Sequence, residues 1–444
     1  MKPDPSCILR ISIVALAAFG APLFLPTSAC AQSEAICEQQ PIAYSSSDLD
    51  DPVTRVQKRL DQGQSRLEFE SRRGYLKSVL ELLGVPVSSQ MLVFSKTSFQ
   101  RDRISPESPR AVYFNDSVYV GWVPFGEVVE VSAVDPQKGA VFYTLSQQRA
   151  EQPSFRRQTH ECLQCHDSSL SQSVPGHLVR SVHPDSRGLP ILSAGTFLTN
   201  HSSPLSERWG GWYVTGTHGE QKHLGNAFTE RPSHAERQAR TEWPARGNVT
   251  DLAALLDVSG YMTPHSDIIA LMVLEHQTHA QNLITRANYH TRLALRDQEA
   301  MNRALGRPLD ERLDSTTSRI KSVIEPLVRY LLFADEAPLS GRIEGTSDFA
   351  REFAERGPRD KKGRSLRDFD LERRLFRYPL SYEIYSEAFD SLPAPARDLV
   401  YQRLWQALSG EDRSGKFGHL SESDRRALVD IVHETKSGLP GYWR

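Results

Sequence analysis

The strongest constraint in the sequence is a run of five residues near the middle of the chain, Cys162-Leu163-Gln164-Cys165-His166. The chain holds five cysteines and 14 histidines in 444 residues. At this composition, roughly 0.002 matches to Cys-x-x-Cys-His are expected by chance. Two thiols three positions apart lie on one helical turn, and an imidazole follows them directly. The pattern therefore predicts a site that is built from two thiols and one imidazole.

Covalent attachment of haem c is the interpretation that uses all three side chains. Cys162 and Cys165 can reach the two vinyl-derived carbons at one edge of the porphyrin, and His166 then projects its imidazole at the iron as proximal ligand. A thioredoxin-like redox pair needs a βαβ context that the flanking sequence does not supply. A structural zinc site needs four ligands, and a plain disulfide leaves His166 unexplained. We therefore expect one covalently attached haem c.

The N-terminus has the pattern of a secretory signal peptide. Lys2 and Arg10 flank the start, an apolar stretch covers residues 11–25, and Ala29-Cys30-Ala31 supplies a small-x-small cleavage pattern. Gln32 is then the first mature residue, and we expect a periplasmic or secreted protein. Bacterial c-type haems are attached outside the cytoplasm, so this expectation agrees with the motif.

Two other roles of the N-terminus are less consistent with its residues. Pro22 and Pro26 interrupt the apolar stretch, which is shorter than the roughly 20 residues of a spanning helix. A lipoprotein would carry its lipid on Cys30, but Thr27 stands where an aliphatic residue is normally found. We therefore expect no transmembrane anchor after cleavage of the signal.

The composition supports a packed core. Hydrophobic residues make up 39% of the chain and charged residues 24%, which excludes global disorder. The formal net charge is -2, so no overall field attracts nucleic acid or an anionic membrane. Signal cleavage leaves Cys37 without a partner for a disulfide within the chain, so the fold depends on its core rather than on a disulfide framework.

The coarse pattern predicts an α+β fold, mostly helical, with an antiparallel β meander before a loop-rich haem segment. The predicted segments are 1–31 signal peptide, 32–100 N-terminal helical segment, 101–150 β meander, 151–250 haem-attachment region, 251–355 helical region, 356–370 linker and 371–444 C-terminal helical segment. The linker is polar and basic, which is typical of a solvated loop.

Individual elements follow from periodicity and turn signals. We predict strands at 91–95, 111–114, 118–122, 128–134 and 140–145, with a turn at 135–139, and a further strand at 209–217. A long helix capped by Ser266 or Asp267 and a second helix over 313–334 follow. The last helix begins with a capping-box pattern at Ser421.

The motif and two further stretches of the chain carry a family resemblance. Residues 162–166 match the attachment signature of c-type cytochromes, and this resemblance implies the roles of Cys162, Cys165 and His166 only. Much of the mature chain also resembles large, secreted, single-haem bacterial proteins of uncharacterised function, through RWGGWYVTGTHG at 208–219 and LMVLEHQ at 271–277. The chain is several times longer than small class I cytochromes and has one motif where di-haem peroxidases have two, so neither fold is expected for the whole chain.

The ligand on the other side of the iron separates the possible functions. A methionine or histidine there closes the site, whereas an open position invites peroxide or oxygen chemistry. Met262 lies in a loop context that suits a ligand, although packing against the core is the more usual role of such a methionine. His276 shares a predicted helix face with Met272, His279 and Leu283, and its imidazole needs either iron or a hydrogen-bond partner if it is buried.

Other residues after the motif are weaker candidates for the haem pocket. The residues that can line a haem pocket are His201, His218, His223, Trp209 and Trp212. Arg180 and Arg208 can pair with haem propionates, because guanidinium matches carboxylate geometry. Glu275 and His279 hint at a carboxylate metal site, but no second helix of that type is apparent. Each of these residues also has an ordinary surface or core role.

Three functions stay open on the sequence alone. The first is an electron-transfer cytochrome that works with a redox partner protein. The second is a haem enzyme of peroxidase or oxygenase type with an open distal site. The third is a haem-based redox or gas sensor, or a structural subunit of a larger complex. No Ser-His-Asp elbow, phosphate loop or nucleic-acid-binding motif competes with them.

Overall fold

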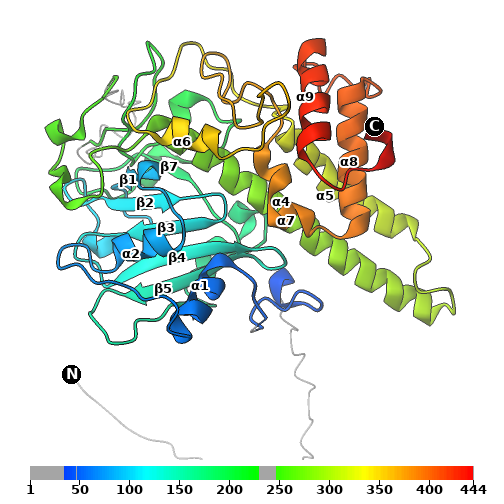
Figure 1. Ribbon diagram of the computed structural model, residues 1–444, viewed down its shortest axis with the longest axis horizontal. Helices are drawn as coiled ribbons and strands as arrows, with labels where there is room; N and C mark the ends of the chain where they lie inside the picture. The colour runs from blue at the N-terminus through cyan, green and yellow to red at the C-terminus, as the bar shows by residue number, and fades with distance from the viewer. Residues whose placement is uncertain (1–34, 47, 230–246, 444) are drawn as a thin grey trace, which may run out of the picture. The chain divides into compact units, whose positions relative to one another are not determined.

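The computed structural model describes residues 35–46, 48–229 and 247–443 of the chain. The predicted signal peptide, 1–31, lies outside the described residues. From residue 35 onward the described chain forms one compact unit. Its architecture is α+β, as predicted, with a six-stranded antiparallel sheet followed in the chain by long helices (Figure 1).

The sheet is a meander in which each strand pairs with the next one in sequence. Its strands are β1 (Met91–Val93), β2 (Arg110–Phe114), β3 (Val118–Trp122), β4 (Val128–Asp135), β5 (Gly139–Ser146) and β6 (Arg156–Gln158). The Asp135 carboxylate accepts hydrogen bonds from the backbone N–H groups of Gln137 and Lys138, both at 2.8 Å, and closes the β4–β5 turn. Gly139 follows with a φ of 72°, which favours glycine. The predicted meander and its turn are confirmed, whereas β6 was not predicted.

The two faces of the sheet are covered by different parts of the chain. One face carries a cross-strand row formed by Phe114, Tyr119, Ser132 and Phe142. We call this the α4 face, because the Tyr119 hydroxyl donates to Gln281 of helix α4 at 2.7 Å. The alternate residues of the strands point to the opposite face, where they form a second hydrophobic cluster with helices α1 (Pro52–Asp61) and α2 (Leu76–Leu82).

Helix α4 (Ile268–Ala304) is the central helical element. Its 37 residues give a length of about 55 Å. The Asp267 carboxylate caps its first turn by accepting from the N–H groups of Ile269 and Ala270, as predicted. Every residue from Ile268 to Thr278 is buried, so the start of the helix is enclosed on all sides.

Six further helices complete the fold of the described chain. They are α3 (Leu163–His166), α5 (Asp314–Leu331), α6 (Phe349–Glu355), α7 (Glu387–Asp390), α8 (Ala394–Ser409) and α9 (Glu422–Thr435). Of these, α5, α6, α7 and α8 pack against α4. The predicted helix at 313–334 is confirmed as α5, and Ser421 caps α9 in a capping box with Asp424. Among the described helices, none combines the length and apolar character needed to cross a bilayer.

The predicted strand at 209–217 is wrong. Its residues form only single bridges, to four separate segments of the described chain, such as the bridge between Trp212 and Val93. Gly211 and Gly216 have φ values of 87° and 155°, which interrupt the extended run that a strand needs. The true short hairpin of this region pairs β7 (Arg180–Val182) with β8 (Thr196–Leu198), neither of which was predicted.

The stretch 356–370 has no long helix or strand, but it is not solvated throughout. The side chain of Arg367 is buried and pairs with the Asp116 carboxylate at 2.7 Å. Its guanidinium also lies over the rings of Phe353 and Tyr382, at 4.6 and 4.4 Å from their centroids. A basic residue of the predicted linker is therefore part of the packed interior.

Candidate functional site

The Cys-x-x-Cys-His run forms a single helical turn. The N–H of His166 donates to the carbonyl of Cys162 at 3.0 Å, and the N–H of Cys165 donates to the same carbonyl at 3.3 Å. This turn brings both thiols and the imidazole to one place, as the spacing predicted. Cys162 and Cys165 are free thiols, Cys165 exposed and Cys162 half-buried. Burial raises the pKa of the Cys162 thiol to about 11, with a smaller contribution from the Glu130 charge.

The orientation of the His166 ring is fixed by a backbone group. Its Nδ1 lies 2.8 Å from the carbonyl oxygen of Gly176, so Nδ1 must carry the proton and donate it. The N–H of Gly176 donates in return to the His166 carbonyl at 2.9 Å. Burial lowers the pKa of His166, which favours the neutral ring. The lone pair is therefore on Nε2, and no described residue forms a hydrogen bond with that atom.

This arrangement is the one that metal-binding histidines use. A ligating imidazole nearly always donates its other ring N–H to a carbonyl or carboxylate, which fixes the tautomer and raises the basicity of the ligand. His166 has this geometry. Its ring also packs against Phe142 on the α4 face of the sheet, with centroids 4.7 Å apart.

The segment that holds His166 is itself anchored at three points. The N–H of Ala140 on β5 donates to the Pro175 carbonyl at 3.1 Å. The side chain of Asn282 on α4 accepts from the His177 N–H at 3.0 Å and donates to the His177 carbonyl at 2.8 Å. A Cβ at Gly176 would collide with the Asn282 amide, so only glycine fits there. Sheet and helix together thus set the position of the carbonyl that orients His166.

The side chain of His177 provides the third anchor. Its Nε2 lies 2.6 Å from the Ser132 hydroxyl, and its ring lies 4.0 Å from that of Tyr119. Burial lowers the pKa of His177 to about 3, so this ring is neutral. No sequence pattern pointed to His177, Gly176 or Asn282. The one available signal was the Asn282 amide within a predicted helix, because a buried amide requires hydrogen-bond partners.

Cys37 forms a hydrogen bond with the residue that directly follows the motif. Its thiol donates to the Asp167 carboxylate, directly after His166, with a sulfur–oxygen distance of 3.1 Å. Burial and this carboxylate together raise the pKa of the Cys37 thiol well above its usual range. The cysteine that had no partner in the sequence is thus a hydrogen-bond donor that ties the N-terminal segment to the site.

The structure does not bring the two predicted distal ligands to the motif. His276 is fully buried, with Nδ1 at 2.8 Å from Nδ1 of His201 and Nε2 at 2.7 Å from the Ser381 hydroxyl. It lies six residues before Asn282 on α4, so the two side chains point about 120° apart around the helix. Met262 packs in the hydrophobic cluster on the sheet face opposite α4.

The remaining pocket candidates belong to the core beside α4. Arg208 pairs with the buried Glu275 carboxylate at 3.1 Å and donates to the carbonyls of His201 and Ser203, so its guanidinium is already engaged.

The aromatic candidates also have partners in the core. Trp209 is fully buried beside His223, with ring centroids 5.3 Å apart, and the His223 ring lies 4.7 Å from that of His218. Trp212 donates its Nε1–H to the Arg180 carbonyl at 2.9 Å. His279 lies beside Tyr330 at 4.6 Å. In the described part of the chain, no three His, Cys, Asp or Glu side chains form a metal-binding group.

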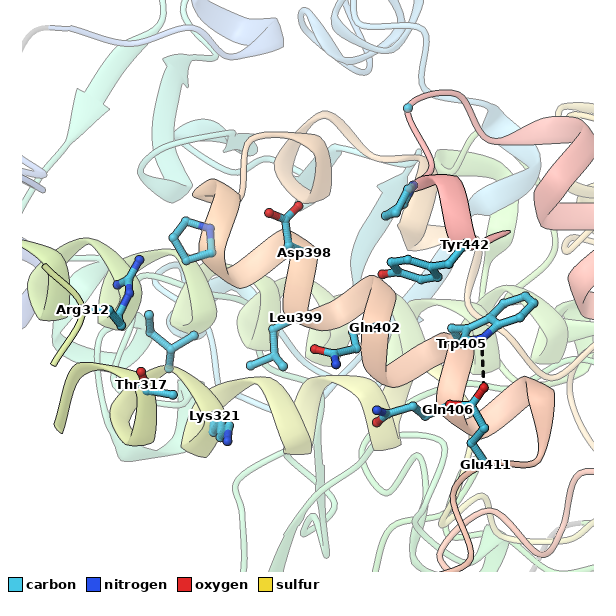
Figure 2. Close-up of a pocket in the computed structure, with 14 residues that line it drawn as sticks. Arg312, Thr317, Lys321, Asp398, Leu399, Gln402, Trp405, Gln406, Glu411 and Tyr442 are labelled. Atoms are coloured by element: carbon cyan, nitrogen blue, oxygen red, sulfur yellow. Dashed lines mark hydrogen bonds between the residues drawn. The ribbon is translucent and has the colours of Figure 1, made fainter. Parts of the chain in front are cut away.

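A groove lies away from the motif, between α5, α8 and the C-terminal segment. It encloses about 830 Å³ and contains Lys321, Asp398, Trp405 and Tyr442 (Figure 2). The Trp405 Nε1–H donates to the Glu411 carboxylate at 3.2 Å, which occupies its polar group. The groove has no cluster of nucleophiles or metal ligands.

Comparison with known proteins adds no relative. No protein-family model matches the chain, and neither a curated protein nor a solved structure shows significant similarity to it.

Proposed function

We propose that the chain is an exported c-type cytochrome that binds one haem covalently through Cys162 and Cys165, holds its iron through His166, and transfers electrons to or from a partner protein. The observation that carries this proposal is the tautomer of His166. Its Nδ1 donates to the Gly176 carbonyl at 2.8 Å, which leaves the Nε2 lone pair for a metal beside two free thiols.

The residues of the motif fit a covalently attached haem. Each cysteine can add its S–H across a vinyl group, so that one S–C bond forms, the hydrogen moves to the neighbouring carbon, and no oxidant is consumed. When bound, haem supplies a one-electron iron couple. His166 supplies a ligand whose basicity is raised by the Gly176 carbonyl. Leu170, four residues after His166, has 49% of its surface exposed and offers apolar surface to a porphyrin edge.

Export supports the same proposal. The N-terminal pattern predicts cleavage before Gln32, and the attachment of haem c takes place outside the bacterial cytoplasm. A periplasmic or secreted location, and a redox partner there, are part of the proposal.

A haem enzyme or sensor with an open distal position is the second candidate. The observation that favours it is that His276 has both ring nitrogens in hydrogen bonds, and Met262 packs on the other face of the sheet. Absorption spectra of the ferric and reduced protein separate the two. A low-spin reduced spectrum that carbon monoxide leaves unchanged supports the carrier, whereas a high-spin spectrum that shifts with carbon monoxide supports the enzyme or sensor.

The haem proposal is tested with cysteine variants in a host that carries a haem-maturation system. We expect covalent haem stain on a denaturing gel for the unmodified chain. C162A and C165A should each lose one attachment, and the double variant should lose the stain. C37S is the matched control, because it removes the third cysteine of the mature chain but keeps a hydroxyl that can donate to Asp167, and it should keep the stain. A double variant that stays stained would contradict the proposal.

A further inference from the structure

The groove between α5, α8 and the C-terminal segment has an aromatic end. Trp405 of α8 and Tyr442 of the short C-terminal helical turn Gly441–Trp443 lie there, with ring centroids 6.2 Å apart and ring planes at 61°. Tyr442 keeps 44% of its surface exposed, and both residues line the groove (Figure 2). Together the two rings form one bent aromatic surface along the groove.

Trp405 is held in place by the protein itself. Its ring packs against the buried Trp443, with centroids 5.6 Å apart. Its Nε1–H donates to the Glu411 carboxylate at 3.2 Å. Because these contacts already fix the ring, a ligand that stacks on it costs little side-chain entropy.

Polar side chains with free hydrogen-bonding groups continue the groove beyond the rings. Asp398, Gln402 and Trp405 are four and three residues apart on α8, so they lie on one face of the helix. Lys321 of α5 lines the same groove. Within the described chain, the side chains of Lys321, Asp398 and Gln402 form no hydrogen bond or ion pair. Gln402 and Asp398 thus offer unused groups about 5 and 11 Å along the helix from Trp405.

The charges that line the groove favour a neutral ligand. The cations of Arg312 and Lys321 are matched by the carboxylates of Asp398 and Glu411. A ligand with a strong charge of either sign therefore gains no net attraction from the groove.

The walls of the groove do not suit the common modes of peptide binding. An amphipathic helix needs a hydrophobic groove, and an extended peptide needs a free strand edge. The described walls are two helices and a coil segment, with polar or charged side chains between the apolar ones. A proline-rich peptide docks between aromatic rings, but Trp405 and Tyr442 lie edge to face in contact and leave no slot between them.

We propose that this groove binds a neutral oligosaccharide of glucose-like sugars. Equatorial hydroxyls leave the faces of such a sugar ring to C–H groups, so one sugar stacks on Trp405 and Tyr442. The sugars that follow lie along α8, where Gln402 and Asp398 form hydrogen bonds with their hydroxyls. The volume of about 830 Å³ is within the range of ligand pockets. The motif takes no part, so binding is expected with or without haem.

The test is isothermal titration calorimetry of the purified protein with three neutral trisaccharides: cellotriose, tri-N-acetylchitotriose and maltotriose. We expect saturable binding of at least one of them. Its affinity should be the same at about 50 mM and about 500 mM NaCl, because salt screens only interactions between charges. Trigalacturonic acid, an anionic trisaccharide, and a decaproline peptide are the competing probes.

Variants of the groove locate the binding. Y442A should weaken it about tenfold, because the stacked ring is lost, whereas Y442F keeps the ring and should keep the affinity. Q402A should weaken it about fivefold through the lost hydrogen bonds to hydroxyls. F125A and Q148A are the matched controls, since Phe125 and Gln148 are exposed and lie outside the groove, and they should bind as the unmodified chain does.

Four results would overturn the assignment. None of the three trisaccharides binds at up to about 10 mM. Trigalacturonic acid binds more tightly than all of them, with an affinity that falls as salt rises. Decaproline binds and the saccharides do not. A trisaccharide binds, but Y442A and Q402A leave its affinity unchanged, which places the binding elsewhere. If Y442A does not fold, Q402A decides, because Gln402 is exposed on the helix surface.

Discussion

His166 is held by a chain of contacts that ends at Asn282 on α4. The Gly176 carbonyl accepts from the imidazole, and the Asn282 amide fixes the next residue, His177, through both of its backbone groups. This second set of contacts acts on the ligand without touching it, as is usual around protein metal sites. Asn282 is therefore a positioning residue for the proposed haem ligand.

Replacing Asn282 should change the potential of the haem. In N282L the backbone N–H and carbonyl of His177 lose their partners, which costs about 1–3 kcal/mol of stability. The Gly176 carbonyl is then less firmly placed, so His166 becomes a weaker base and the midpoint potential should rise. The measurement is a redox titration combined with urea unfolding.

Asn288 supplies the control on the same helix. It is buried and donates to the Ser391 carbonyl at 3.3 Å, away from the motif. N288L should lose stability and leave the potential unchanged. Equal potentials for N282L and the unmodified chain, or equal shifts for N282L and N288L, would count against the positioning role.

Among individual residues, the sequence predicted the contacts within the turn that holds the motif. It did not predict the contacts between residues that are distant in the chain. The spacing from Cys162 to His166 is local, and the structure forms the expected turn. Gly176 and Asn282 lie 10 and 116 residues from His166. Their meeting depends on how the loop crosses the sheet and α4, which no periodicity records.

Helix α4 is the element on which the site is built, and its start is tied down by one carboxylate. Asp267 accepts from the N–H groups of Ile269 and Ala270 and also from those of Thr346 and Ser347. The sequence predicted the first role from the N-cap pattern. It did not predict the second role, because residues 346 and 347 are about 80 positions away.

Removal of this carboxylate should destabilise the protein more than the loss of an ordinary cap. D267A leaves four N–H groups without an acceptor in a buried place, so we expect a loss above the usual range of about 0.5–2 kcal/mol. S421A removes the cap of α9, which is exposed, and should cost about 1 kcal/mol. Urea unfolding of both variants measures the difference. Equal losses would show that the contacts to residues 346 and 347 add nothing.

The elements that the sequence predicted well are those with local signals. The strands β2 to β5 are runs of β-branched and aromatic residues separated by turns, and α4, α5 and α9 have caps or periodicity. The strands β6, β7 and β8 have three residues each, too few to show a period. The stretch 209–217 has the composition of a strand, but its bridges go to four separate segments.

Across the whole molecule, buried titratable groups make stability depend on pH. Burial lowers the pKa of several histidines from 6.5, to about 3 for His177, His223 and His276 and to about 4 for His279. Burial raises the pKa of three carboxyl groups from 4.5 to about 7 for Glu275 and Glu336 and about 8 for Glu383. The histidines affect stability from pH 6.5 downward and the carboxyl groups from pH 4.5 upward, with opposite signs.

The unfolding free energy should therefore fall on both sides of a maximum. Below pH 6.5 the unfolded chain binds protons at histidines that the folded chain keeps neutral, so their contribution is lost as the pH falls. Above pH 4.5 the folded chain retains protons on the buried carboxyl groups that the unfolded chain releases, so their contribution is lost as the pH rises towards 8. Each group contributes a slope of up to about 1.4 kcal/mol per pH unit.

Urea unfolding at about pH 4, pH 5.5 and pH 8 measures this profile. We expect the highest free energy of unfolding at the middle value. E383Q should flatten the alkaline side, because it removes the carboxyl group with the highest of these pKa values. A free energy that stays constant from pH 5.5 to pH 8 would contradict the assignment of the buried carboxyl groups.

The most direct test of the central claim is the intact mass of the protein under denaturing conditions, after expression with a haem-maturation system. The account predicts the mass of the chain plus one haem, because two thioethers at Cys162 and Cys165 survive unfolding. The bare mass of the chain, from a preparation in which a known c-type cytochrome is correctly matured, would contradict it.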